Sequence, residues 1–250
     1  MSDSSQTFGQ SGLPLNRIST QWSALHDPSH FLIRYAVSVR NYLEALLRDS
    51  QDADDVSQEF LMSVVAKGFV RADADRGRFR DYLKISVHNA AMSHLRRKRL
   101  QPGLLDASAM QFVATEPDST EDVAWLSNWR QCLLDRVWRA IESHEHGAPE
   151  SLYHTVLRQS VDHSEEDSAK LAERVSIQIG RPLRADAFRK QLSRARRLFA
   201  ELLVSEVAKT LENVTPELVE DELRETGLLP YIQPFLPADW RERGQLKDAE

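Results

Sequence analysis

Hydrophobic side chains recur along most of this chain at intervals of three and four residues, the spacing of one face of a helix. The pattern is clearest over residues 78–99, a stretch that contains neither Gly nor Pro. On a helical wheel, its apolar side chains form one inward stripe, namely Phe79, Leu83, Val87 and Ala90. A second face mixes apolar, amide and cationic side chains, namely Tyr82, Ile85, Asn89, Met92 and Arg96. We therefore predict a helix with a packing face, a mixed outer face and a cationic end.

Two further helices are expected before this one. The first should begin at residue 27 or 28 and end near 48, because Asp27 can cap a helix and Pro28 suits its first turn. The second should cover residues 52–67 and turn four apolar side chains inward, namely Val56, Phe60, Leu61 and Val64. Its opposite side carries a polar ridge made of Asp54, Asp55, Gln58, Glu59 and Met62. Acidic groups around an exposed Met indicate a protein-docking face, and an ordinary solvated acidic face is the alternative.

The C-terminal half shows the same periodicity. One apolar stripe predicts a long helix from about Val123, and consists of Trp125, Trp129, Leu133, Val137 and Ile141. Cys132 falls within this helix and is interpreted as a small core residue. Shorter helices are expected over residues 149–160 and 168–175.

A last helix is predicted over residues 185–203, after a turn that contains Gly180 and Pro182. Its inward side chains would be Phe188, Leu192, Ala195 and Phe199. A helix, a turn and a basic second helix form the arrangement of a helix-turn-helix DNA reader. The expected connection, residues 176–186, is several residues longer than in the usual motif.

The predicted fold is all-α, with two small helical domains joined by an acidic, flexible linker. The expected segments are a disordered N-terminus (1–20), a first domain (21–100), the linker (101–122), a second domain (123–204) and a C-terminal extension (205–250). In the extension, Thr215 and Pro216 are typical of a helix start and Gly227 of a helix end. The apolar residues that follow, 228–240, are expected to pack on the second domain or on a partner.

The distribution of charge along the chain singles out the two basic helices. The 250-residue chain has a net charge of −6, yet residues 71–99 hold nine Lys or Arg against three Asp. Residues 181–197 hold seven Lys or Arg against one Asp. Two basic segments in an acidic protein indicate two separate contacts with a polyanion such as DNA. The alternative is a set of scattered, solvated helix faces.

Other classes of protein find little support in the sequence. The chain lacks the motifs of P-loop enzymes, HExxH metalloproteases, GxSxG hydrolases and GxGxxG dinucleotide-binding proteins. His144, Glu145 and His146 diverge on a helix and have no obvious third metal ligand. We therefore expect no enzyme, no catalytic residue, no cofactor and no metal site. A single Cys, the lack of a long apolar run and the lack of a signal-peptide pattern favour a cytoplasmic protein without membrane insertion.

Taken in order, these segments resemble the bacterial RNA polymerase sigma factors, in particular the extracytoplasmic-function (ECF) group. Residues 52–65 read DADDVSQEFLMSVV and are similar to the family's polymerase-docking motif. Residues 79–99 read FRDYLKISVHNAAMSHLRRKR and are similar to its helix for the −10 promoter element. The segments PESLYHTVLRQ, LAERV and FRKQLSRARRLFAELL are similar to its second DNA-binding domain. The stretch GRPLRADAFRKQLSRAR is similar to that of sigma-like proteins from planctomycetes.

The resemblance implies a transcription-initiation factor that binds core RNA polymerase and promoter DNA. The implied polymerase contacts are the clamp coiled coil of the largest subunit, bound by Asp54, Asp55, Gln58, Glu59 and Met62, and the flap of the second-largest subunit. The residues implied to bind and open the −10 element are Arg78, Arg80, Tyr82, Asn89, Arg96, Arg97, Lys98 and Arg99. Those implied for the −35 element are Arg189, Lys190, Ser193, Arg194 and Arg197. An anti-sigma factor or another regulator is a further partner that the resemblance allows.

The chain departs from the family's pattern at several positions. The family's Trp and Tyr-Arg are replaced by Tyr82 and Lys84-Ile85, and its Asp-Tyr by Ser93-His94. The extension, 205–250, has no counterpart in the minimal family. Two other readings therefore stay open. One is a sigma-mimicking regulatory module that binds a polymerase or anti-sigma partner without reading a promoter. The other is a plain helix-turn-helix repressor, which leaves the first two motifs unexplained.

Overall fold

The computed structural model describes residues 28–67, 78–100, 119–148, 150–211 and 214–241. The expected disordered N-terminus (1–20) and most of the expected linker (101–118) lie outside the described residues. Residues 119–122 of the expected linker are described and are helical. Every described regular element is a helix, which confirms the all-α prediction.

The helices follow one another in the order that the sequence predicts. The N-terminal half contributes α1 (Pro28–Leu47), α2 (Ser50–Lys67) and α3 (Phe79–Leu100). The C-terminal half contributes α4 (Ser119–Gly147), α5 (Tyr153–Asp162), α6 (Ser168–Ile179), α7 (Ala185–Ala208), α8 (Pro216–Glu225), α9 (Leu229–Ile232) and the 3-10 turn η5 (Gln233–Phe235). None of these described helices combines the length and the apolar character needed to cross a bilayer.

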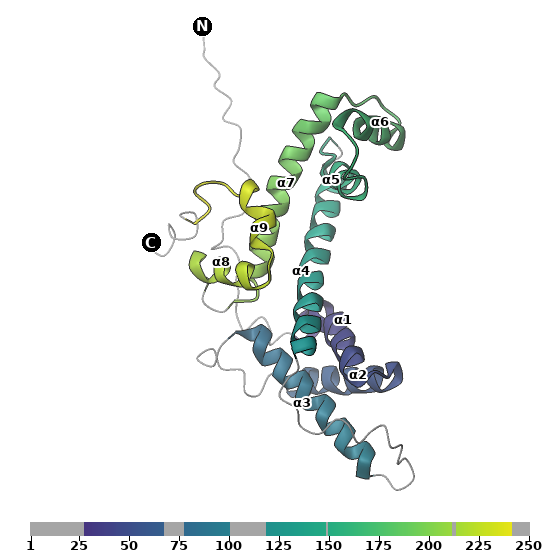
Figure 1. Cartoon of the computed structure of the whole chain (residues 1–250), viewed down its shortest axis with the longest axis vertical. Helices are drawn as coiled ribbons and strands as arrows, with labels where there is room; N and C mark the ends of the chain where they lie inside the picture. Colours follow the sequence, from purple (N-terminus) through teal and green to yellow (C-terminus); the bar gives the residue numbers. More distant parts are fainter. Residues whose placement is uncertain (1–27, 68–77, 101–118, 149, 212–213, 242–250) are drawn as a thin grey trace.

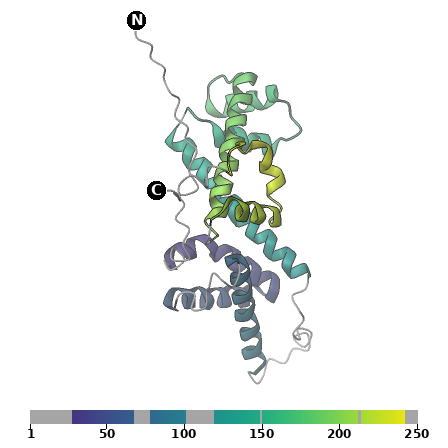
Figure 2. The same ribbon diagram turned by 90° about the vertical axis from the view of Figure 1, so that its left-hand side faces the viewer.

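The long helix α4 forms the axis of the molecule (Figure 1). The group α1, α2 and α3 lies at one end of α4, and α5, α6 and the first turns of α7 lie at the other. A view at right angles shows the same two groups, with α8 and α9 placed along α7 between them (Figure 2). Packing contacts agree with this arrangement, because α4 contacts α1 as well as α5 and α7.

The inward stripe of α3 is largely as predicted. Phe79, Leu83 and Val87 are fully buried. The fourth buried position is Ala91 and not Ala90, which is only partly buried. The buried positions are thus four residues apart. Because four residues make slightly more than one helical turn, these side chains lie on one side of α3, where it packs against α1.

The connection of the helix-turn-helix is shorter than expected. Helix α6 continues to Ile179, past the predicted end near residue 175, so that only residues 180–184 join it to α7. Gly180 ends α6 in the left-handed conformation (φ 67°), which costs a residue without Cβ little. The Ser176 hydroxyl accepts a hydrogen bond from the Leu183 amide (2.8 Å) and closes the turn. The prediction of a long connection was wrong, because the sequence pattern gave α6 too short a length.

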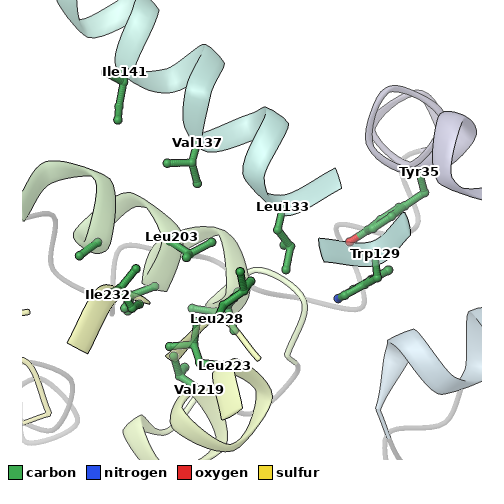
Figure 3. Close-up of a cluster of buried hydrophobic side chains, with 14 of the residues drawn as sticks. Tyr35, Trp129, Leu133, Val137, Ile141, Leu203, Val219, Leu223, Leu228 and Ile232 are labelled. Atoms are coloured by element: carbon green, nitrogen blue, oxygen red, sulfur yellow. The ribbon is translucent and has the colours of Figure 1, made fainter. Parts of the chain in front are cut away.

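All five residues of the predicted α4 stripe are buried, but they serve two neighbours. Trp129 stacks on Tyr35 of α1, with ring centroids 5.4 Å apart, and burial raises the pKa of Tyr35 to about 12. Leu133, Val137 and Ile141 instead point toward α7 (Figure 3). The hydrophobic core is therefore continuous from α1 to α7 among the described residues. The predicted domain boundary near residue 123 stays a prediction.

A buried ion pair also joins the two halves. Arg34 of α1 donates a hydrogen bond to Glu206 of α7 over 2.5 Å, and both side chains are nearly inaccessible to solvent. Cys132 of α4 lies beside this pair, half-buried, and its Sγ is 3.1 Å from the Arg34 carbonyl oxygen. Such a pair is costly to break, because removing one partner leaves the other charge buried.

The C-terminal extension is folded as the sequence predicts. The Thr215 side chain caps α8 by accepting from the Leu218 amide (3.3 Å), and Gly227 follows α8 with φ 68°. Val219 and Leu223 of α8 pack with Leu203 of α7 in the common core (Figure 3). The extension is therefore an integral layer of the C-terminal half.

Candidate polymerase and nucleic-acid interface

The predicted docking ridge lies on the outer side of α2. Asp54, Asp55, Gln58, Glu59 and Met62 are all exposed, while Ala53, Val56 and Val64 on the opposite side are buried. Asp54 pairs with Arg40 of α1 (2.6 Å). The structure thus brings the five predicted residues together on one accessible face.

An apolar cavity of about 580 Å³ lies beside this ridge, between α1 and α2. Three of its large apolar side chains are exposed, namely Val37 (69%), Met62 (64%) and Val65 (45%). Asp54 and Gln58 form part of its polar border. Met62 was predicted from the sequence as part of the docking surface, whereas Val37 and Val65 were not. The signal for them was present, because both fall off the buried stripes of their helices.

The mixed face of α3 is partly exposed and partly packed against the core. Ile85 is 60% exposed and Asn89 is exposed, whereas Tyr82 and Met92 are partly buried and pack against the core. The backbone carbonyl oxygen of Asn89 accepts a hydrogen bond from the Ser93 hydroxyl (2.8 Å). An exposed amide and an exposed apolar side chain next to a partly buried aromatic ring suit the capture of an unstacked base.

The cations at the end of α3 lie over α2. Arg97 donates two hydrogen bonds to the Glu59 carboxylate, at 2.7 and 2.9 Å, and this bidentate pairing lowers the pKa of Glu59 below its usual value. Lys98 donates to Asp52 (2.7 Å), and the His94 Nε2 lies 3.3 Å from the same carboxylate. Burial by itself raises the pKa of Asp52, but Lys98 and His94 outweigh it, so that the pKa lies below its usual value. Arg96 and Arg99 are exposed at the same end.

The cations at the start of α3 are held by the C-terminal extension. Arg80 is only 7% exposed, and it donates to Glu222 of α8 (2.6 Å) and to Glu225 (2.9 Å). Arg78 is half-buried and contacts the same two carboxylates. Nothing in the sequence pattern indicated these contacts, because they join residues more than 140 positions apart.

The predicted recognition face of α7 is accessible. Phe188, Leu192 and Ala195 are buried, while the five predicted residues, Arg189, Lys190, Ser193, Arg194 and Arg197, are exposed. Arg197 pairs with Glu201 one turn further along the same helix (3.1 Å). Within the described part of the chain, no carboxylate pairs with Arg189, Lys190 or Arg194. The phosphate-binding capacity of this face is thus uncommitted.

The His144–Glu145–His146 stretch has a structural place in the fold. Glu145 accepts hydrogen bonds from the Thr155 amide (2.9 Å) and the Thr155 hydroxyl (2.5 Å), and so holds the start of α5. The His144 ring stacks on Tyr153, with centroids 5.4 Å apart. These contacts account for the polar end of α4.

Comparison with known proteins finds a match in the N-terminal half. Residues 31–101 match the family model described as sigma-70 region 2, a segment that contains the α2 ridge and all of α3. The chain matches no curated protein and no solved structure. The region-2 match covers both motifs on which the resemblance was based in this half of the chain. Residues 31–101 are thus similar to sigma-70 region 2, and the match supports a sigma-70 family factor.

Proposed function

We propose that this protein is a sigma factor of the ECF group that recruits core RNA polymerase to specific promoters and opens the −10 element. One observation carries the proposal. In the segment that matches sigma-70 region 2, an acidic ridge is exposed on α2, and Asn89 is exposed on the adjoining α3, on the face that also carries the partly buried ring of Tyr82. The first suits a partner protein and the second a melted strand.

Polymerase binding is assigned to α2. Asp54, Asp55, Gln58 and Glu59 would contact cationic groups of the polymerase clamp, and the apolar cavity beside Met62 would take apolar side chains of the same coiled coil. An apolar centre with a charged border is the usual build of a protein–protein interface. The exposed Val37 and Val65 would be covered in the complex.

DNA binding is assigned to two helices. Tyr82 and Asn89 of α3 would hold bases of the open −10 strand, with Arg96 and Arg99 on its phosphates. Arg189, Lys190, Ser193, Arg194 and Arg197 of α7 would lie in the −35 major groove, where Arg can read guanine edges with two hydrogen bonds. No step requires a catalytic residue or a cofactor, and the protein would act in the cytoplasm.

A sigma-mimicking regulatory module is the second candidate. One observation favours it: four of the cations expected to contact DNA, Arg78, Arg80, Arg97 and Lys98, are paired with carboxylates of the protein itself. Such a module would bind polymerase or an anti-sigma partner without reading a promoter.

The test is co-purification of the tagged protein with core RNA polymerase from its host, followed by transcription of a genomic fragment library. Retention of polymerase with discrete start sites that share −35 and −10 motifs would support the sigma factor. Retention without transcription would favour the mimic. No retention would exclude both.

The docking face has its own matched pair of variants. Asp55→Lys with Glu59→Lys should abolish retention of core polymerase, because it reverses two charges of the ridge. Glu142→Lys with Glu173→Lys makes the same charge change at exposed positions on α4 and α6, and should leave retention unchanged. Equal retention by the two variants would contradict docking through α2.

A further inference from the structure

The C-terminal extension touches both surfaces that are proposed to bind DNA. At one end, the α8 carboxylates of Glu222 and Glu225 hold Arg78 and Arg80 at the start of α3. At the other end, Phe235 of η5 lies against Arg196 of α7, with the guanidinium carbon 5.4 Å from the ring centroid. One short segment thus contacts two basic helices that are far apart in the sequence.

At α3, the two carboxylates of α8 bind Arg in the way that a DNA phosphate would. Arg80 directs two nitrogens at carboxylate oxygens, at 2.6 and 2.9 Å, and Arg78 approaches the same two groups. Phosphate oxygens bind Arg in the same forked geometry and with the same charge preference. Because Glu222 is 1% exposed and Arg80 is 7% exposed, a DNA phosphate cannot reach Arg80 while α8 is in place.

The contact at α7 lies beside the recognition face. Phe235 lines a cavity of about 390 Å³ together with Arg189, Ser193 and Arg196. Arg189 and Ser193 are two of the five residues proposed to enter the −35 groove. A DNA backbone that approaches this side of α7 would meet the Phe235 ring.

The segment is anchored between these contacts. Val219, Leu223, Leu228 and Ile232 are buried in the core that α8 and α9 share with α7. The anchor keeps the two contacts at a high effective concentration, as a linked second binding site does. The carboxylate of Glu225, by contrast, is half-exposed and can be exchanged for another anion.

We propose that the C-terminal segment 214–241 is an intramolecular competitor of promoter DNA. In it, Glu222 and Glu225 occupy Arg78 and Arg80, while Phe235 packs on Arg196 of α7, beside Arg189 and Ser193. This proposal rests on the proposed function, since it needs α3 and α7 to bind DNA. DNA binding and closure of the segment exclude one another at Arg80 of α3, and at α7 the Phe235 ring narrows the approach beside the exposed recognition face. Promoter engagement therefore requires α8 to release α3, and a partner that stabilises the released state raises DNA affinity.

The experiment measures binding of the full chain to a short fluorescent duplex of random sequence, over a range of salt concentrations. Glu225→Gln removes one competing charge from a half-exposed position and should raise the affinity several-fold, with a salt slope larger by up to about one. Glu217→Gln is the matched control, because it makes the same charge change at an exposed position of α8. Equal affinities of the two variants would overturn the competition at α3.

A second pair of variants tests the contact at α7. Phe235→Leu keeps apolar packing but removes the ring from Arg196, and it should raise affinity for the duplex. Tyr231→Ala alters another aromatic side chain of the same segment, one that is 75% exposed, and should not. Hydrogen exchange adds an independent readout: DNA should speed amide exchange in α8, and unchanged exchange on DNA binding would contradict release.

The outcomes distinguish failure of the competition proposal from failure of the sigma-factor proposal on which it rests. If the wild-type chain binds DNA and the four variants bind equally, the competition is wrong and the sigma-factor proposal stands. If neither the wild-type chain nor any variant binds DNA, even with core polymerase added, both fail.

Discussion

The two basic segments of this chain, residues 71–99 and 181–197, have the same net charge in sequence and differ in which of their charges are paired. On α3, Arg78, Arg80, Arg97 and Lys98 are paired with carboxylates of α2 and α8. On α7, the only predicted DNA-binding cation with an ion pair among the described residues is Arg197, and its partner Glu201 lies in the same helix. Net charge is therefore a poor guide to available charge: similar totals give one face that is largely committed and one that is open.

The difference has a physical origin. Helix α3 is packed between other elements and meets the carboxylates of its neighbours, while the outer side of α7 faces solvent. The committed pairs also differ among themselves. Arg97 and Glu59 are more than half exposed, whereas Glu222 is 1% exposed. Exposed pairs contribute little to stability, but a buried charge that loses its partner is expensive.

The largest expected effect comes from breaking the buried pair. Glu222→Ala leaves the Arg80 guanidinium buried without its principal partner, and should lower the free energy of unfolding by about 3–5 kcal/mol. Urea unfolding followed by circular dichroism measures this loss. Glu217→Ala, on the exposed side of the same helix, should cost less than about 1 kcal/mol. A small loss at Glu222 would show that the α8–α3 pairs are not part of the stable fold.

The open face of α7 should respond in the opposite way. Arg189→Ala with Lys190→Ala removes two exposed cations and should change the free energy of unfolding by less than about 0.5 kcal/mol. Affinity for a duplex that carries the −35 element should fall about 10- to 100-fold, and the salt slope should decrease by about two. Titration at several salt concentrations measures both. An unaltered salt slope would mean that this side of α7 does not contact phosphates.

The smallest expected effect concerns the partly buried cluster of Asp52, His94 and Lys98. The pKa of Asp52 is lower in the folded chain than its ordinary value of 3.8, so its contribution to stability is present above about pH 4 and is lost as the pH falls through the lowered pKa. Asp52→Asn should cost up to about 1 kcal/mol at neutral pH. The difference from the wild-type chain should shrink as the medium is acidified, which urea unfolding at a series of pH values would show.

The control for this series is Asp55→Asn on the exposed side of the same helix. A difference between the wild-type chain and Asp52→Asn that stayed constant with pH would remove the charge pairing as its cause.

Sequence periodicity predicted the helices well wherever burial was one-sided. The stripes of α3, α4 and α7 are buried almost residue for residue, because a helix that packs on one face must repeat its apolar side chains near every 3.6 residues. The end of α6 was missed, although Ile179 continues the stripe of Leu171 and Val175 and packs against the core. Ile177 is 77% exposed, and the end is set instead by Gly180 and by the Ser176–Leu183 hydrogen bond.

For the candidate site, local sequence determined which side chains share a face. Asp54, Asp55, Gln58, Glu59 and Met62 meet on α2, and Tyr82, Ile85 and Asn89 meet on α3, because helix geometry alone fixes these neighbours. The pairing of Arg78 and Arg80 with Glu222 and Glu225 was decided only by tertiary structure. Those partners are more than 140 residues apart, and only the packing of α8 on α7 carries the carboxylates to the start of α3. The same packing decides which of the two basic helices keeps its charges free.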